Sequence, residues 1–300
     1  MSADLQTNQI PATAPARRAV DRRHRSVPLS IAGLVGKALL VVLGLLMLAP
    51  FWWATATSLV PDPRAFSLPP SWFPTSVQFA NFRQVFVLIP FLHQILNSVE
   101  VTAIIVVGSL AVSLLAAFAF ARLQFRGREV LFTVFLAALM VPSQVTLIPT
   151  YILMRYAHLL DTHIALWLPA LIQVFSIFML RQHFLSLPKD LEEAARLDGA
   201  GNLRILAQIF LPMSAPIVSA LAIFIATTYW NDFITPNTYL SSPGQLTIPV
   251  GLASLQGQFG QSPTTVVFAG ITIVVLPLLV LFLFTQRRLT EGIALSGISR

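Results

Sequence analysis

Cysteine is absent from this chain of 300 residues, and charged side chains are scarce. The lack of cysteine excludes a disulfide framework, thiolate metal sites and cysteine nucleophiles. Asp, Glu, Lys and Arg together make up only 10% of the residues, against about 25% in ordinary soluble domains. The composition therefore argues against a soluble globular protein.

Sequence signatures of common catalytic and nucleotide-binding sites are also missing. The chain contains neither the H-E-x-x-H motif nor the G-x-S-x-G motif. Gly36-Lys37 is not part of a P-loop, because Ile31 stands where that motif needs its first glycine and Ala38 where it needs Ser or Thr. The five histidines lack metal-ligand spacing. We expect that this chain is not an enzyme and that it binds neither a metal ion nor a cofactor. Any ATP would therefore act through a separate chain.

Long apolar segments are abundant. Hydrophobic residues make up 56% of the chain, and its mean hydropathy is +0.76. A membrane-spanning helix needs about 20 mainly apolar residues, and lipid favours helices because it offers no partners to open backbone groups. The sequence predicts an all-α polytopic membrane protein with a six-helix transmembrane domain over residues 30–285. The predicted spans are roughly 34–59, 99–121, 130–153, 164–180, 213–233 and 266–284.

The distribution of Lys and Arg predicts the orientation in the membrane. Only Arg64, Arg83 and Arg155 of the 19 basic residues fall outside the N-terminal region, the second-to-third loop, the fourth-to-fifth loop and the C-terminal tail. By the positive-inside rule these four regions are cytoplasmic, and they account for the net charge of +7 without nucleic acid. The first apolar run is longer than the roughly 7–15 residues of a cleaved signal peptide. We expect a disordered basic tail at 1–29 and a second cytoplasmic tail at 286–300.

The loop at 182–212 has its own helical signals. Pro188 suits the first position of a helix, acidic residues follow in the first turns, and Gly199 suits the helix end. We predict one helix from about Pro188 to Asp198, a turn at Gly199, and a second helix to about Phe210, with Pro212 opening the next span. The spans are expected to bury no part of this loop. An interfacial amphipathic helix without a partner is the general alternative. The apolar surface of the first helix comes from Leu191, Ala194, Ala195 and Leu197.

The spacing within this loop resembles the E-A-A loop of permease subunits in binding-protein-dependent ABC importers. The resemblance implies docking of this loop on an ATPase subunit that binds ATP and Mg²⁺. It also implies two copies of that ATPase, a second, non-identical permease, and an extracytoplasmic solute-binding protein. The residues that carry the resemblance or the docking are Glu193, Ala194, Ala195, Asp198, Gly199, Ile209, Leu211 and Pro212.

Features outside the loop extend the resemblance over residues 30–300. They are Asn97-Ser98, the segment 142–166 with its prolines, "YWNDF" at 229–233, and "QRRLTEGIALSGISR" at the C-terminus. The last of these is similar to the tail of the second permease in the maltose-like carbohydrate branch, where the tail reaches the ATPase. Ser299 and Arg300 stand in place of the usual Lys-Gly ending.

Polar residues within or beside the spans are candidates for lining a solute pathway, since irregular or polar helix at membrane depth is tolerated where it lines a cavity. Pro142 and Pro149 are expected to break the third span. Each polar residue also has a simpler role open to it, such as capping a helix, bonding to a neighbouring helix or reaching the membrane surface. Glu100 and Phe175 are weaker candidates. The main candidates are Asn97, Gln144, Gln173, Tyr229, Asn231 and Asp232.

The predicted function is a transport subunit of a bacterial or archaeal plasma membrane that forms half of a pathway for a sugar, with a di- or oligosaccharide as the expected cargo. Uptake of glycerol phosphate or a polyol is the alternative within the family. An ion-driven secondary transporter is the alternative of another class, but it would need ionisable residues at mid-membrane, whereas the acids here lie at the ends of spans.

Overall fold

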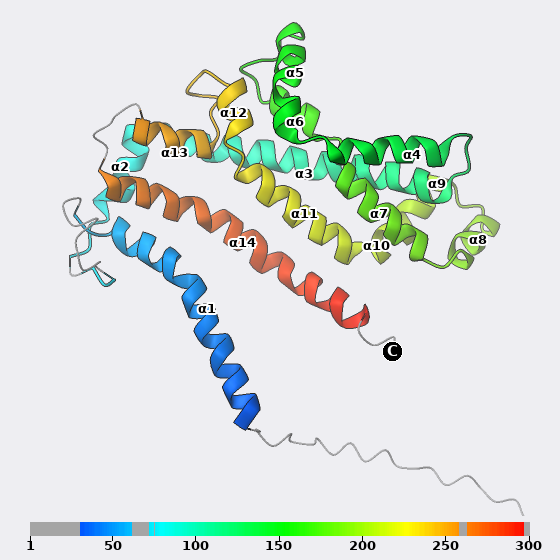
Figure 1. Cartoon of the computed structure of the whole chain (residues 1–300), viewed down its shortest axis with the longest axis horizontal. Helices are drawn as coiled ribbons and strands as arrows, with labels where there is room; N and C mark the ends of the chain where they lie inside the picture. The colour runs from blue at the N-terminus through cyan, green and yellow to red at the C-terminus, as the bar shows by residue number, and fades with distance from the viewer. Residues whose placement is uncertain (1–30, 62–71, 75, 258–262, 297–300) are drawn as a thin grey trace, which may run out of the picture. The chain divides into compact units, whose positions relative to one another are not determined.

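The computed structural model describes residues 31–61, 72–74, 76–257 and 263–296 (Figure 1). All regular secondary structure in this part of the chain is helical, so the all-α prediction is confirmed. The predicted tail at 1–29 and residues 299–300 lie outside the described residues. The chain divides into two compact units, residues 1–48 and residues 49–300.

Helix α1 (Ile31–Ser58) contains Pro50. Its part up to Leu48 exposes nearly every apolar side chain, as expected of a helix whose surroundings are lipid. In the second unit, Thr57 and Ser58 at the helix end are buried. There the Asn81 amide donates to the carbonyls of Ser58 (2.8 Å) and Val60 (3.1 Å), which ties this end to helix α2 (Ala80–Leu88).

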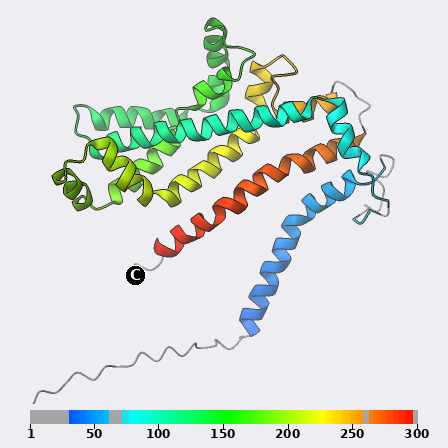
Figure 2. The same ribbon diagram turned by 180° about the vertical axis from the view of Figure 1, so that it is seen from behind.

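The second unit is built around helix α3 (Phe91–Arg122), which packs along α7 (Val174–Ser186) and α11 (Ala215–Trp230). Helix α11 also packs against α14 (Thr264–Ser296), and therefore lies between α3 and α14 (Figure 2). Helix α13 (Ile248–Gly257) contacts both α3 and α14. The other helices are α4 (Arg128–Ala137), α5 (Ser143–Tyr156), α6 (Ile164–Ala170), α8 (Asp190–Leu197), α9 (Asn202–Ile205), α10 (Leu211–Met213) and α12 (Ile234–Tyr239).

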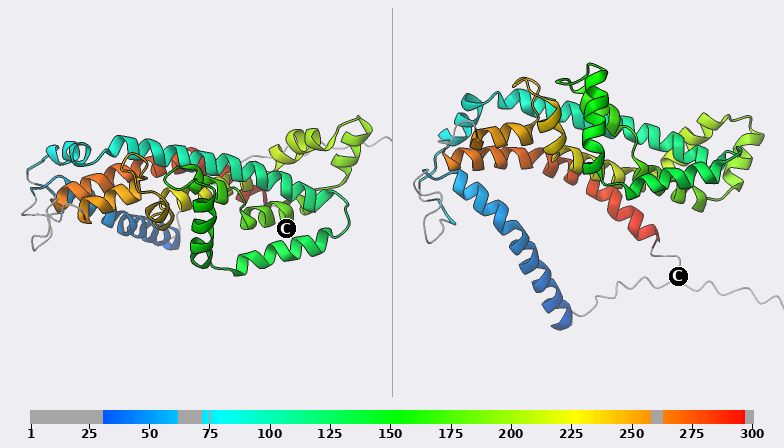
Figure 3. Two further views of the ribbon diagram at one scale, coloured as in Figure 1. Left: turned by 90° about the horizontal axis from the view of Figure 1, so that it is seen from above. Right: turned by 45° about the horizontal axis from the view of Figure 1, so that its top comes forward.

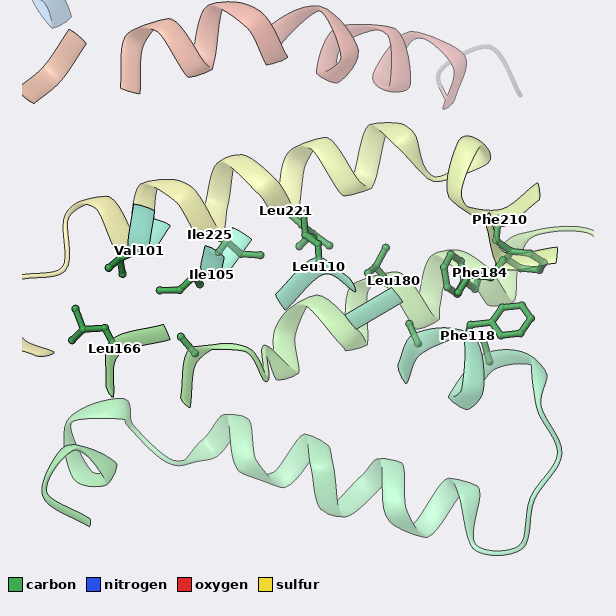
Figure 4. Packing of buried hydrophobic residues seen from close by; sticks show 14 of the residues in the cluster. Val101, Ile105, Leu110, Phe118, Leu166, Leu180, Phe184, Phe210, Leu221 and Ile225 are labelled. Atoms are coloured by element: carbon green, nitrogen blue, oxygen red, sulfur yellow. The ribbon is translucent and has the colours of Figure 1, made fainter. Parts of the chain in front are cut away.

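The main hydrophobic core lies where α3, α7 and α11 meet. Figure 4 shows buried side chains from these helices facing one another along the contact. A second cluster joins α2, α13 and α14 to the start of α3. Labelled in Figure 4 are Val101, Ile105, Leu110, Phe118, Leu166, Leu180, Phe184, Phe210, Leu221 and Ile225.

Two of the predicted spans are interrupted, and a third begins at a bend. Helix α4 and its short 3₁₀ extension (Ala138–Met140) meet α5 at a bend of 102°, and α5 projects away from the α3–α7–α11 layer (Figure 3). Pro142 lies at this bend as predicted, but Pro149 does not break its helix and lies inside α5. An irregular step at 171–173 separates α6 from α7. The segment Asn202–Met213 meets α11 at a bend of 82° near Ser214, and the helix after the bend begins at Ala215, three residues after Pro212.

Three described helices are long and apolar enough to cross a membrane: Gly33–Ser58, Phe91–Arg122 and Ile164–Ser186. The number rises to five if each bent pair forms one span, and Thr264–Val280 is a further, shorter apolar helix. Each of the six predicted segments falls on one of these features.

Candidate functional site

Helix α8 occupies most of the predicted first helix of the loop. Asp190, Glu192 and Glu193 lie in its first turn, where negative charge complements the helix dipole. At its end the N–H of Gly199 donates to the carbonyl of Arg196 (3.0 Å), and the N–H of Ala200 donates to that of Ala195 (2.9 Å). This bonding pattern is a Schellman cap, which satisfies the last carbonyls and ends the helix at a defined residue.

Gly199 adopts a left-handed conformation, with φ of +79°. A left-handed residue at this position closes a Schellman cap, and glycine takes that conformation without steric cost. A Cβ added at Gly199 would meet no atom within 4 Å. The glycine is therefore required by the backbone of the turn rather than by packing within this chain.

The second half of the loop is not free of the bundle, contrary to the expectation that the spans bury none of it. After α9 the chain forms a π-helical segment, Leu206–Phe210, which sequence reasoning missed. Ile205, Leu206 and Phe210 are buried, because this apolar face packs on α3 and α7. The ring of Phe210 lies edge-on to Phe118 (5.3 Å) and Phe184 (5.1 Å), as Figure 4 shows.

The residues of the predicted coupling set divide into two groups. Ala195 and Ile209 are partly buried and pack against the main core. The rest are exposed, and they form the surface that this loop offers to another molecule. The exposed members are Glu193, Ala194, Asp198, Gly199, Leu211 and Pro212.

A cavity of about 850 Å³ lies between α8 and the connection from α3 to α4. Both signs of charge line it, with Arg122, Arg128 and Arg196 facing Glu129 and Glu192. Arg181, behind the cavity, donates to Glu129 (3.1 Å) and lies over the ring of Phe132 (4.0 Å). In the sequence, these arginines are recognisable only as markers of orientation in the membrane. An arginine at the end of an apolar span was the signal that could have directed attention to Arg122.

A second cavity, of about 340 Å³, lies between α3, α5, α6, α11 and α12. It brings together three of the predicted pathway residues, Gln173, Tyr229 and Asp232. Gln173 Nε2 donates to the Tyr229 hydroxyl (2.6 Å), and the Asp232 carboxylate accepts from the Thr235 N–H (3.2 Å). Sequence reasoning missed the hydroxyls on the same walls, because Ser and Thr are common in membrane helices. They are Ser98, Thr102, Ser143, Thr146, Thr150, Thr235 and Thr247.

The other pathway candidates lie elsewhere. Asn97 holds the loop at 244–246 against α3, because its amide donates to the carbonyls of Gly244 (2.8 Å) and Leu246 (3.0 Å). Asn231 donates to the Thr227 carbonyl of its own helix (2.7 Å). Gln144 is exposed and accepts a long bond from Ser143 (3.4 Å). Of the weaker candidates, Glu100 lies 3.5 Å from His163, and Phe175 packs on Phe224.

Asp161 fastens the segment at 241–242 to the turn before α6. Its carboxylate accepts from the N–H groups of Ser241 and Ser242 (both 2.8 Å) and from the Ser242 hydroxyl. These bonds stabilise the charged form and lower the pKa of Asp161 to about 2. Asp161 itself has φ of +60°, a conformation that Asp tolerates better than most residues. Among the residues that the structure describes, no group of three or more acidic or histidine side chains could hold a metal ion.

The long apolar helices are those expected of a membrane protein, and comparison with known proteins specifies which kind. The family model "Binding-protein-dependent transport system inner membrane component" matches residues 109–294. The chain belongs to this family. Its relatives are ABC transporter permeases, which are transport subunits rather than enzymes.

Two relatives illustrate the range of similarity. The arabinooligosaccharides transport system permease protein AraQ of Halalkalibacterium halodurans is 36% identical over 202 residues, which is 67% of this chain and 72% of AraQ. The diacetylchitobiose uptake system permease protein DasC of Streptomyces coelicolor is 31% identical over 260 residues, covering 86% and 94% of the two chains.

A solved structure shares the fold. It is a chain from the crystal structure of a bacterial ABC transporter involved in the import of the acidic polysaccharide alginate. The TM-score is 0.76 at 24% identity, over 87% of this chain and 98% of that chain.

Proposed function

We propose that this chain forms half of the translocation pathway of an ATP-driven sugar importer. A second, non-identical permease supplies the other half, two ATPase subunits with bound ATP and Mg²⁺ supply the energy, and an extracytoplasmic binding protein delivers the solute. Family membership supports this arrangement, because the family is defined by dependence on a binding protein. Membership of this family also argues against an ion-driven secondary transporter.

The exposed surface of α8 and the turn at Gly199 form the docking site for the ATPase. Support comes from the capped, ordered helix that presents Glu193, Ala194 and Asp198 outward. The small side chain of Ala194, which is exposed, leaves the backbone open to close approach by a partner.

The positive-inside rule places this loop, both termini and the α3–α4 connection in the cytoplasm. Reporter domains fused after Arg128 and after Arg204 test the orientation. Both fusions should report a cytoplasmic location, and an external location for either one would contradict the proposal.

The cargo is an uncharged carbohydrate, and the lining of the second cavity is the observation that carries this choice. The lining contains hydroxyls, one amide and one carboxylate, Asp232, and no Lys, Arg or His among the described residues. Such a wall can donate to and accept from sugar hydroxyls, but it offers no cation to a phosphate. Its volume lies at the small end of the range of about 300–1,000 Å³ for ligand pockets. Two of the relatives are named as permeases of oligosaccharide transport systems.

Uptake by the reconstituted transporter tests this choice. Proteoliposomes with the complete complex and internal ATP should accumulate a labelled neutral oligosaccharide, and they should not accumulate labelled glycerol phosphate. Gln173→Leu removes the amide that faces Tyr229 and should lower sugar uptake by about tenfold. That factor corresponds to a loss of about 1.4 kcal/mol in the interaction of the sugar with the pathway. Thr228→Val, at an exposed position on the same helix as Tyr229, is the control and should change little. Preferential uptake of the phosphate would refute a neutral cargo.

A further inference from the structure

Two adjacent acids on α8 lie in opposite environments. Glu193, which belongs to the E-A-A signature, is exposed, and its carboxylate makes no hydrogen bond or ion pair with any residue that the structure describes. Glu192 is 9% exposed and turns toward the bundle. Glu193 is thus open to a partner, whereas Glu192 interacts within this chain.

Glu192 forms the centre of a charge cluster. Its Oε1 accepts from Arg196 Nη2 at 2.7 Å, one turn further along α8, and Arg196 Nη2 also donates to Asn202 Oδ1 on α9 (2.9 Å). Its Oε2 lies 3.8 Å from Nη1 of Arg122, at the end of α3. The two side chains of this last pair are 12% and 4% exposed, so water screens their attraction less than at an open surface.

Arg122 is held by neutral groups on two further elements. Its Nη2 donates to the carbonyls of Phe184 (2.6 Å) and Leu187 (2.7 Å) at the end of α7. Its guanidinium also lies 4.9 Å from the ring centre of Phe210 in the π-helical segment. None of these groups carries a negative charge, so Glu192 is the acid that balances Arg122 within this part of the chain.

We propose that Arg122 and Glu192 are positioning residues for coupling: their buried charge pair fixes α8 relative to the end of α3. A displacement of α8 by the ATPase then moves α3, α7 and Phe210 together, because separating the pair would leave the buried guanidinium of Arg122 without an opposite charge. Of these elements, α3 carries part of the wall of the second cavity. The inference rests on the proposed function, and it assigns to Glu192 a role distinct from that of Glu193.

A distance measurement on the assembled transporter tests the pair directly. Because the chain has no cysteine, Arg126→Cys and Leu197→Cys place two unique spin labels at exposed positions on either side of the pair. In a labelled complex that still transports, the distance distribution should be narrow. Glu192→Gln should broaden it, and Arg122→Gln combined with Glu192→Gln should broaden it no further, since both changes remove one interaction. Glu193→Gln is the matched control, and its distribution should stay narrow.

The functional readout is the amount of ATP hydrolysed per solute transported. Glu192→Gln should raise this ratio about tenfold, within the 5–150-fold range typical of coupling between sites, while basal ATP hydrolysis persists. A narrow distribution in Glu192→Gln, or broadening with an unchanged ratio, would overturn the proposal. Failure of the sugar assignment would show instead as absence of sugar uptake by the unmodified complex, whatever the distance distribution of the variants.

Discussion

Gly199→Asp should leave the protein in the membrane and uncouple it from its ATPase. The change is made at the left-handed residue that closes the cap of α8. It adds a carboxylate beside Asp198, on the exposed surface that we assign to docking. The E-A-A resemblance implies that this glycine lies at the proposed contact.

The structure allows the internal cost to be estimated. A side chain at Gly199 would meet nothing within 4 Å, so the penalty inside this chain is the left-handed backbone alone. That conformation costs an L-residue about 1–2 kcal/mol, and Asp, which tolerates it, should pay the lower figure. A cost of about 1 kcal/mol confined to an exposed turn is small beside a total folding stability of about 5–15 kcal/mol. Folding and insertion should therefore survive, and any large loss belongs to the contact with the ATPase.

The assay measures membrane abundance, co-purification with the ATPase, transport and solute-stimulated ATP hydrolysis. Gly201→Asp is the matched control: it adds the same carboxylate in equally open space, two residues away, where φ is −76°. Gly199→Ala separates the backbone term from the charge. We expect normal abundance for all three variants and loss of both activities in Gly199→Asp. Wild-type transport by Gly199→Asp would refute the docking role and favour an interfacial helix without a partner.

Two further predictions concern the structure away from this loop. Asp161→Asn should speed amide exchange at 241–242 at neutral pH, because the charged acceptor is lost. Since the pKa of Asp161 is lowered from 3.8 to about 2, its stabilisation in the unmodified protein should be complete above about pH 4 and lost as pH falls through about 2; loss of protection already at pH 6 would contradict this. Gly251→Ala would place a Cβ against the buried amide of Gln94 and should lower stability by about 1–3 kcal/mol. Gly244→Ala meets no atom within 4 Å and should be neutral; equal melting temperatures for both variants would contradict the packing argument.

Much of the fold could be predicted because its signals are local. Apolar length predicted helices at the right places, and Gly199 with its preceding acids predicted α8 and the turn after it. The bends were harder to predict. Pro142 marks one of them and Pro212 lies two residues before another, but Pro149 is accommodated inside α5 without a bend. Bends of this kind depend on packing between helices that are distant in sequence.

The site was only partly predictable for the same reason. Gln173 and Tyr229 were chosen for their polarity, and the fold brings them together at 2.6 Å from residues far apart in the chain. Asn97 has the same kind of polarity, but its amide binds the carbonyls of the loop at 244–246. No pattern in the sequence separates a residue that lines the cavity from one that holds a loop. Arg122 looked like a marker of topology, because its partners on α7 and α8 become neighbours only after folding.

Cross-linking to the ATPase tests the central claim most directly. Leu197→Cys gives α8 a unique thiol at a position that is 90% exposed, and Met140→Cys gives one at an 85% exposed position at the α4–α5 bend. In membranes that contain the complete transporter, a short thiol-to-amine cross-linker should join the protein to the ATPase subunit from Leu197→Cys and not from Met140→Cys. Cross-linking from Met140→Cys alone would contradict the assignment of α8 as the element that the ATPase contacts.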